Sequence, residues 1–103
     1  MTVYIDNLRP CLKSKIWPYP ESCHLIADSI PELHKFAINK LGLKPYWFQN
    51  RKHLPHYDLT KNMRRKAVRL GAVQIGDAQV ALMMKRSRDR LRNLTSKPDE
   101  GSR

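Results

Sequence analysis

The chain has 103 residues, a length that fits one ordinary domain and excludes a large multidomain enzyme. It carries 20 Lys and Arg against 9 Asp and Glu, a formal net charge of +11 at pH 7, which favours a polyanion or an acidic protein as partner. Hydrophobic residues make up 41% of the chain, so the composition is that of a folded domain rather than of a disordered basic tail.

The first residues predict a strand and then an irregular loop. Residues 2–6 (TVYID) are β-branched and aromatic, as strands commonly are, and the strand is expected to end where Asp6 and Asn7 favour a turn. Three prolines predict an irregular loop over residues 9–22, because proline removes a backbone donor and restricts the residue before it. Residues 24–27 predict a second strand.

The middle of the chain predicts a helix, a strand and a loop. Ser29 and Glu32 have the spacing of a capping box, and apolar residues then recur on one helical face up to Leu41, after which Gly42 ends the helix. The aromatic run at residues 46–49 predicts a strand. The basic and ring-bearing residues 50–57 predict a loop.

Two further helices are expected in the more basic half. Asp58 or Thr60 can cap a helix that runs to Leu70 and ends at Gly71. Residues 72–75 predict a short strand and residues 77–94 a third helix. The expected order is β, loop, β, α, β, α, β, α, so we predict one small α/β domain over residues 1–94, with helices on a short mixed sheet and a flexible tail over 95–103.

The third helix is basic and amphipathic. Its apolar stripe is expected to consist of Val80, Met84, Ser87, Leu91 and Leu94. Such a stripe, bordered by cations, can dock on a partner, but it can equally pack on the chain's own sheet with the charges simply solvated. The residues expected to bind a protein or nucleic acid are Trp17, Lys61, Arg64, Arg65, Arg69, Lys85, Arg86, Arg88, Arg90 and Arg92.

Aromatic residues offer a second kind of contact. Tyr4 and Phe48 are expected in the core, whereas Trp17 lies in the proline-rich loop and could fill a pocket of a partner. Pro18 and Pro20 make that loop a possible ligand of a host prolyl isomerase, because X-Pro bonds isomerise slowly.

Four histidines and three aspartates lie within the first sixty residues, the one constellation that resembles a catalytic or metal site: His24, His34, His53, His56, Asp6, Asp28 and Asp58. Their spacing matches neither a helical HExxH motif nor a CxxC pair. The expectation is therefore hydrogen-bonded or solvated histidines, with His34 at the edge of a helix stripe, and no metal, cofactor or catalytic residue. With four glycines, the chain cannot assemble a phosphate-binding loop.

No segment is apolar over 18 residues, and the start MTVYIDN lacks the features of an export signal. A cytoplasmic protein without membrane contact is expected. Cys11 and Cys23 are then expected to be free thiols with no chemistry.

Several short motifs resemble an uncharacterised family of short bacterial and phage proteins. They are VYIDN at the start, CHLIAD at 23–28, ELHKFA at 32–37, YWFQ at 46–49, HYDLT at 56–60 and GAVQI at 71–75. The resemblance implies a shared polar motif without an assigned activity, formed by His24, Asp28, His34, His56, Tyr57 and Asp58. Among phage members, the chain most resembles the accessory anti-RecBCD proteins of lambdoid phages.

Three functions are therefore carried forward. The leading one, which the resemblance implies, is a non-enzymatic phage modulator in the host cytoplasm that binds the RecBCD helicase-nuclease and alters its exonuclease activity. The first alternative is direct binding of nucleic acid, with a steep salt dependence. The second is a metal-assisted hydrolase that uses His24, His34, His56 and Asp58.

Overall fold

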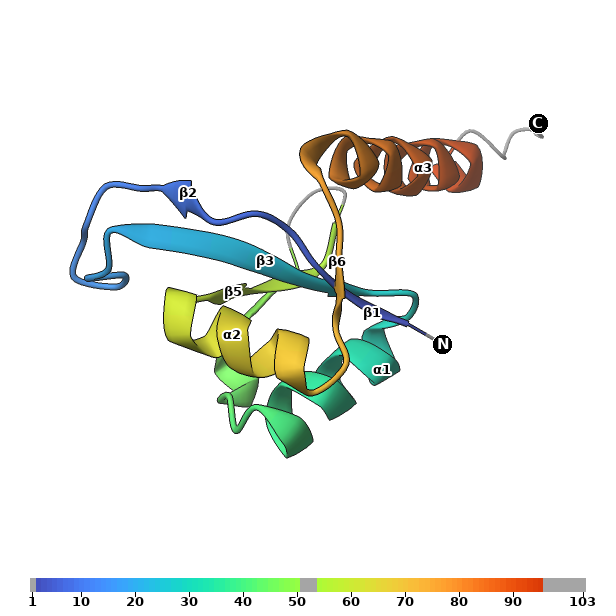
Figure 1. The fold of residues 1–103 in the computed structure, drawn as a ribbon. Helices are drawn as coiled ribbons and strands as arrows, with labels where there is room; N and C mark the ends of the chain where they lie inside the picture. The colour runs from blue at the N-terminus through green and yellow to red at the C-terminus, as the bar shows by residue number, and fades with distance from the viewer. Residues whose placement is uncertain (1, 51–53, 96–103) are drawn as a thin grey trace.

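The computed structural model describes residues 2–50 and 54–95, with side chains to residue 87. Six short strands form one mixed sheet in the order β4-β5-β3-β1-β6, and β2 pairs with β3 beside this path (Figure 1). The pairing of β1 with β6 is parallel and the other pairings are antiparallel. The strands are β1 (Val3–Ile5), β2 (Arg9–Pro10), β3 (Glu21–Ala27), β4 (Phe48–Gln49), β5 (His56–Leu59) and β6 (Val73–Gln74).

Helices lie on both sides of the sheet, which confirms the α/β class. The helical segments are α1 (Ile30–His34), its π-helical continuation η1 (Lys35–Lys40), the single turn η2 (Pro45–Trp47), α2 (Lys61–Arg69) and α3 (Asp77–Thr95). In Figure 1, α1 and α2 lie below the sheet and α3 lies above it. None of the described helices is both long and apolar enough to span a membrane.

The alternation of side chains along the strands divides the apolar residues into two clusters. Ile5, Leu25 and Tyr57 point towards α1 and α2 and are fully buried in the larger cluster. On the opposite face, Ile26 of β3 packs with residues from the segment around α3 in a smaller cluster: Ile26, Ile75 and Val80. The face below α3 is therefore only partly covered by apolar packing.

The helix ends lie where the sequence predicts them. The Ser29 side chain accepts a hydrogen bond from the Glu32 backbone N–H at 3.4 Å, and the Thr60 hydroxyl accepts one from the Met63 N–H at 3.2 Å. Gly42 and Gly71 follow the first two helices with φ of +75° and +110°, a conformation that favours glycine.

Three expected segments differ from the structure. The loop expected over residues 9–22 contains β2 (Arg9–Pro10) and the start of β3 (Glu21–Ala27), which pair with each other. Residues 45–47 form a helical turn that begins at a proline, so only Phe48–Gln49 of the expected strand 46–49 is extended. Residues 56–59 form a central strand, β5, although a loop was expected as far as residue 57. Asp58 therefore lies within a strand, and Thr60 is the cap of α2.

The buried side of α3 differs by one position from the expected stripe. Val80 is buried and Met83 packs beside it, whereas Met84 is 42% exposed. Val80 and Met83 are three residues apart and so lie on the same helix face, which α3 uses to pack on the sheet. The side chains of Leu91 and Leu94 lie outside the described residues.

The proline-rich segment between β2 and β3 closes a hairpin that projects from the sheet (Figure 1). Trp17 is half-buried there: its indole N–H donates to the Glu21 carbonyl at 3.2 Å, and its ring packs edge-on against Tyr19. Leu12 and Ile16 are far more exposed, at 94% and 93%. The large ring therefore contributes to the packing of the hairpin itself.

Candidate metal centre

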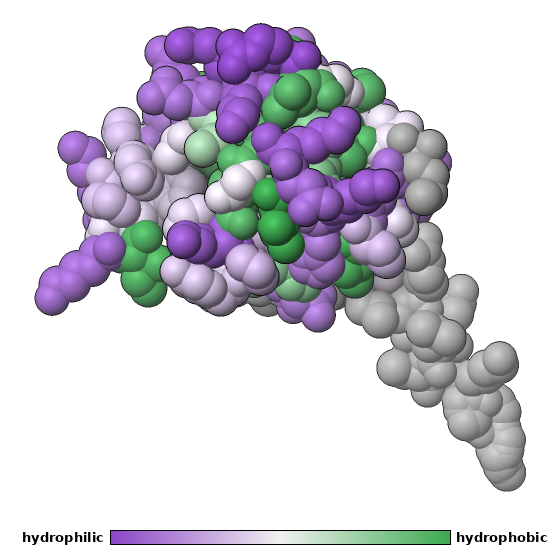
Figure 2. Space-filling model, turned by 90° about the horizontal axis from the view of Figure 1, so that it is seen from below, coloured by the Kyte–Doolittle hydropathy of each residue, from purple (hydrophilic) through white to green (hydrophobic). Residues whose placement is uncertain are grey.

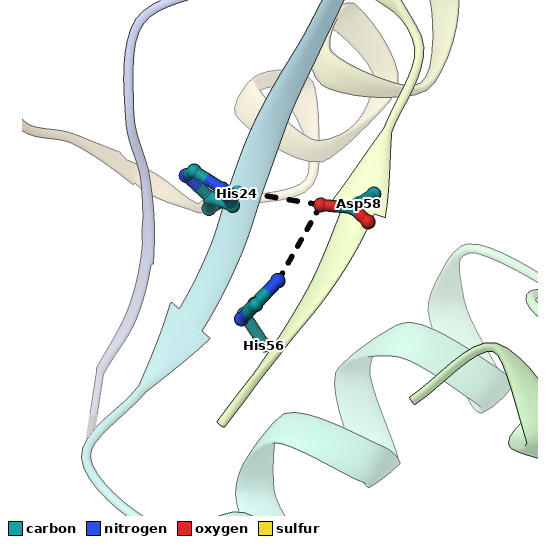
Figure 3. A group of neighbouring side chains, drawn as sticks. All are labelled: His24, His56 and Asp58. Carbon is teal, nitrogen blue, oxygen red and sulfur yellow. Dashed lines mark ion pairs between the residues drawn. The ribbon is translucent and has the colours of Figure 1, made fainter. Parts of the chain in front are cut away.

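Three polar side chains converge on the face of the sheet that α3 partly covers. His24 lies on β3 directly opposite Asp58 of β5, and His56 lies two residues before Asp58 on the same strand. Since paired residues share a face and side chains alternate along a strand, all three project to the same side. Figure 3 shows both imidazoles turned towards the Asp58 carboxylate.

The distances between these side chains suit a shared cation. His56 Nε2 lies 3.5 Å from Asp58 Oδ1, and His24 Nε2 lies 3.9 Å from the same oxygen. One nitrogen or oxygen atom from each of the three residues lies within 4.8 Å of the other two. Two histidines and a carboxylate are a common ligand set for zinc, and with open positions for non-haem iron.

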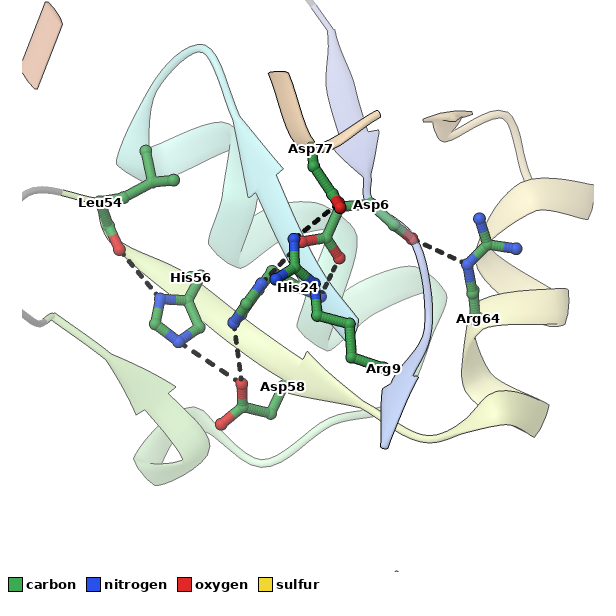
Figure 4. A network of polar contacts seen from close by, with 8 residues as sticks. All are labelled: Asp6, Arg9, His24, Leu54, His56, Asp58, Arg64 and Asp77. Atoms are coloured by element: carbon green, nitrogen blue, oxygen red, sulfur yellow. Dashed lines mark hydrogen bonds and ion pairs between the residues drawn. The ribbon is translucent and has the colours of Figure 1, made fainter. Parts of the chain in front are cut away.

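Asp6 fixes the orientation of the His24 ring by contacting Nδ1, the nitrogen that does not face Asp58 (Figure 4). Its carboxylate accepts the His24 backbone N–H and also faces His24 Nδ1 at 2.7 Å, while its own side chain is fully buried. Burial disfavours the charged carboxylate, but the hydrogen bonds from His24 outweigh this and lower the pKa of Asp6. The charged Asp6 carboxylate therefore holds the proton of His24 on Nδ1, which leaves the lone pair of Nε2 free to bind a metal ion.

The second imidazole is oriented in the same way by a backbone group. His56 Nδ1 donates to the Leu54 carbonyl at 2.9 Å, and a carbonyl can only accept, so Nδ1 carries the hydrogen. Burial opposes the charged imidazolium, but Asp58 and the Leu54 carbonyl outweigh it and raise the pKa of His56. His56 Nε2 therefore faces a carboxylate that attracts a positive charge to this position.

The two distances to the Asp58 carboxylate are close to those of a bound metal site, while the three atoms as a set lie within 4.8 Å of one another. Ligand atoms around a tetrahedral Zn²⁺ are about 3.4 Å apart, given metal–ligand bonds of about 2.0–2.1 Å. The distances of 3.5 and 3.9 Å from the two Nε2 atoms to Asp58 Oδ1 are within about half an ångström of that value. His24 and Asp58 are 38% and 33% exposed, so a bound ion would remain open to water on one side.

The remaining members of the expected polar motif lie elsewhere. His34 and Tyr57 were grouped with the site in sequence, but both lie on the opposite face, where His34 Nδ1 is 2.7 Å from the Tyr57 hydroxyl. The structure therefore does not bring His34 together with His24, His56 and Asp58, as the hydrolase alternative expected. Asp28 accepts hydrogen bonds from the Tyr4 hydroxyl and the Thr2 backbone N–H, both at 2.9 Å. His53 lies outside the described residues.

Sequence reasoning did not assign the roles of the groups that surround the three residues. Asp6 was counted in the constellation of histidines and aspartates and, with Asn7, interpreted as a turn, although it continues the alternation of β1 and so lies on the same face as Tyr4. Arg9 and Asp77 were assigned no role, yet they form an ion pair of 2.6 Å beside this cluster (Figure 4). The alternation of the first strand is the signal that could have identified Asp6.

The basic residues expected to bind a protein or nucleic acid are divided between the two sides of the sheet. The exposed cations of α2 lie on one side, which Figure 2 shows as largely hydrophilic, and those of α3 on the other. Arg64 has an internal role, because its Nε donates to the Asp6 carbonyl at 2.9 Å. The exposed members are Lys61, Arg65, Arg69, Lys85 and Arg86; the side chains of Arg88, Arg90 and Arg92 lie outside the described residues.

The two cysteines are free thiols, as expected. Cys23 is buried in the larger cluster, and burial together with the nearby Asp6 charge raises the pKa of its thiol to about 12. A thiol in this state is not a nucleophile near neutral pH.

A family model described as "Protein of unknown function (DUF4031)" matches residues 3–87. The chain belongs to this family. The DUF4031 match spans every strand and the first part of α3, so it includes His24, His56 and Asp58. No curated protein and no solved structure matches the chain. Because the family description assigns no activity, the function has to be inferred from the geometry.

Proposed function

We propose that this DUF4031 protein is a metal-dependent hydrolase that binds a divalent ion of the zinc class through His24, His56 and Asp58. The observation that carries the proposal is the convergence of the three side chains, with each histidine donating from Nδ1 to a fixed acceptor. A carboxylate or carbonyl behind a metal-binding histidine fixes its tautomer and makes it a better ligand. This gives the metal-assisted alternative stronger support than the sequence provided.

Three protein ligands leave the fourth position of a tetrahedral ion for water. A zinc ion in such a site lowers the pKa of bound water to about 7, which produces a hydroxide nucleophile near neutral pH. The hydroxide oxygen forms a bond to the electrophilic carbon or phosphorus of an ester, the bond to the leaving oxygen breaks, and the proton passes to that leaving oxygen. No oxidant or reductant is required.

Metal binding is tested on protein purified without a histidine tag and treated with a chelator. Isothermal titration with Zn²⁺ should give one equivalent per chain, and Co²⁺ should give the intense visible absorption of a tetrahedral site. His24→Ala, His56→Ala and Asp58→Asn should each abolish binding. His34→Gln is the matched control, because it changes a histidine on the opposite face. Binding that is absent from the parent protein, or that survives all three ligand substitutions, would refute the metal site.

Catalysis is tested separately with a panel of chromogenic carboxylic and phosphoric esters. The zinc-loaded protein should release the chromophore from at least one of them, and the Asp58→Asn variant should not. Stoichiometric zinc without turnover of any ester would leave a structural or regulatory metal site and remove the hydrolase.

A second function rests on a different observation, the exposed cations of α2 and α3. We infer that one of these helix surfaces binds an acidic macromolecule, and the RecBCD helicase-nuclease is the partner implied by the phage resemblance. Supporting features are the net charge of +11 and the exposure of Lys61, Arg65 and Arg69 on α2. In this function the protein acts in the cytoplasm, that of the host if a phage encodes it.

Because the cations of α2 and α3 lie on different faces of the sheet, the contribution of each helix to partner binding can be tested separately. Glu substitutions at Lys61, Arg65 and Arg69 reverse the charge of α2, and Glu substitutions at Lys85 and Arg86 reverse that of α3. One set should prevent co-purification with RecBCD and its effect on degradation of linear DNA, because charge reversal opposes encounter. Binding to duplex DNA alone, with a steep salt dependence, would instead indicate a direct nucleic-acid binder.

A further inference from the structure

We propose that Arg9 forms an anion subsite beside the metal centre, and that the substrate is therefore a phosphate ester. The inference rests on the proposed metal-dependent function and adds the substrate class to it. It follows from the position of Arg9 on the sheet, from its partner Asp77, and from the geometry of the guanidinium group.

The strand register places Arg9 on the same face as the metal ligands. Arg9 of β2 pairs with Ser22 of β3, and Ser22 lies two residues before His24. Paired residues project to one side and alternate residues along a strand do so as well, so Arg9 and His24 share a face.

Arg9 is held there by a contact that an incoming anion can replace. Its guanidinium pairs with Asp77, the first residue of α3, at 2.6 Å, and the two side chains are 51% and 61% exposed. Exposed ion pairs of this kind contribute little to stability, so exchanging one carboxylate for another anion costs little. Figure 4 shows the pair beside His24 and Asp6.

The chemistry of the metal ion and of the Arg9 guanidinium favours a phosphate ester over a carboxylic ester as substrate. A phosphoryl group has several oxygens, so one can bind the metal while two others accept the paired N–H groups of an arginine. The neutral carbonyl of a carboxylic ester offers one oxygen and no charge for the guanidinium. The excess of 11 positive charges on the chain further favours an anionic substrate.

The expected step is hydrolysis of one phosphorus–oxygen bond. The metal-bound hydroxide oxygen forms a bond to phosphorus, the bond from phosphorus to the leaving oxygen breaks, and the leaving oxygen takes up the proton. Arg9 stabilises the negative charge on the phosphoryl oxygens that are not bound to the metal.

The experiment measures binding of inorganic phosphate to the zinc-loaded protein by isothermal titration at about 0.15 M salt, where long-range charge effects are screened. Arg9→Gln should weaken phosphate binding by about 10- to 100-fold, the loss expected for charged hydrogen bonds. Asp77→Asn should tighten it by up to about fivefold, because Arg9 no longer has a competing partner. Arg69→Gln, on the other side of the sheet, is the control with the same change in charge.

The outcomes separate this inference from the metal centre itself. Zinc binds all three variants with the parent affinity if the inference holds, since Arg9, Asp77 and Arg69 are not ligands. Normal zinc binding with phosphate affinity unchanged by Arg9→Gln, or reduced equally by Arg69→Gln, would refute the Arg9 subsite alone. Failure of the parent protein to bind zinc would refute the hydrolase on which the subsite depends.

Discussion

Asp6 is the one buried polar residue among those whose burial the structure describes, and its partners explain why it is tolerated. A buried carboxylate is costly unless its oxygens are satisfied. Here it accepts two hydrogen bonds from His24, while its backbone carbonyl accepts one from Arg64 of α2. The carboxylate therefore orients a proposed metal ligand, while the backbone carbonyl of the same residue bonds to α2. Loss of the buried carboxylate should affect both stability and metal binding.

Asp6→Asn tests this coupling, because it keeps the size of the side chain and removes its charge. We expect zinc affinity to fall by about 10- to 100-fold, as is common when the partner of a metal-binding histidine is changed. Isothermal titration measures the affinity, and circular dichroism establishes that the variant is folded. A folded variant that binds zinc as tightly as the parent would show that Asp6 does not position His24.

The lowered pKa of Asp6 also predicts that the difference in stability between the parent and the Asp6→Asn variant depends on pH. Since the pKa of Asp6 is lowered from 3.8 in the folded chain, its favourable contribution is present above that value and is lost as the pH falls through the folded pKa. The difference in the free energy of unfolding between the parent and the variant should therefore shrink in acid. Urea denaturation at neutral and acid pH measures it, and a difference that grows in acid would contradict the assignment.

The residues of the proposed metal centre could be recognised in the sequence as candidates, although no metal was expected, but their grouping could not be predicted. His24, His56 and Asp58 have side chains that bind metals, and their presence in one constellation is visible from residue types. His34 has the same chemistry and was grouped with them. Its exclusion follows from the packing of α1, which carries His34 on the other side of the sheet, where it contacts Tyr57 of β5. This packing joins segments that are distant in sequence.

At the scale of elements, local signals predicted the helices better than the strands. Ser29 and Thr60 cap the first two helical segments, which end before Gly42 and Gly71, because caps and glycines act within a few residues. In contrast, β5 has only four residues, and two of its side chains are polar on the face of the metal centre. Its extended conformation is stabilised by pairing with β3 and β4, which short-range patterns do not reveal.

The cap of α2 provides a prediction at this scale. Thr60 lies between α2 and β5, the strand of two proposed metal ligands, and its hydroxyl accepts the Met63 N–H. Thr60→Ala should lower the free energy of unfolding by about 1 kcal/mol, the usual cost of losing such a cap. Urea denaturation measures the change, with Thr60→Ser as the control that keeps the hydroxyl. Equal destabilisation by both variants would indicate that the methyl group, rather than the cap, contributes the stability.

At the scale of the whole molecule, the sheet has one thickly covered face and one thinly covered face. The larger cluster, on the side of the sheet that α1 and α2 cover, contains Leu25 and Tyr57. The smaller cluster, on the side of α3, contains Ile26, Ile75 and Val80. Figure 1 shows the helices on these two sides. A metal centre that exchanges water and substrate needs partial exposure, and the thinly covered face provides it. The fold thus separates the residues that supply most of the apolar packing from those that perform the proposed chemistry.

This division predicts that α3 can be loosened without unfolding the rest of the domain. Val80 is buried against Ile26 and Ile75, so Val80→Ala removes two methyl groups and should cost about 1–3 kcal/mol. We expect amide hydrogen exchange to accelerate in α3 while the protection of β3 and α2 is retained, because few buried contacts hold α3. Leu82→Ala is the matched control, since Leu82 lies on the same helix and is 46% exposed. Equal acceleration in α2 and α3 would show instead that both faces of the sheet unfold as one cooperative unit.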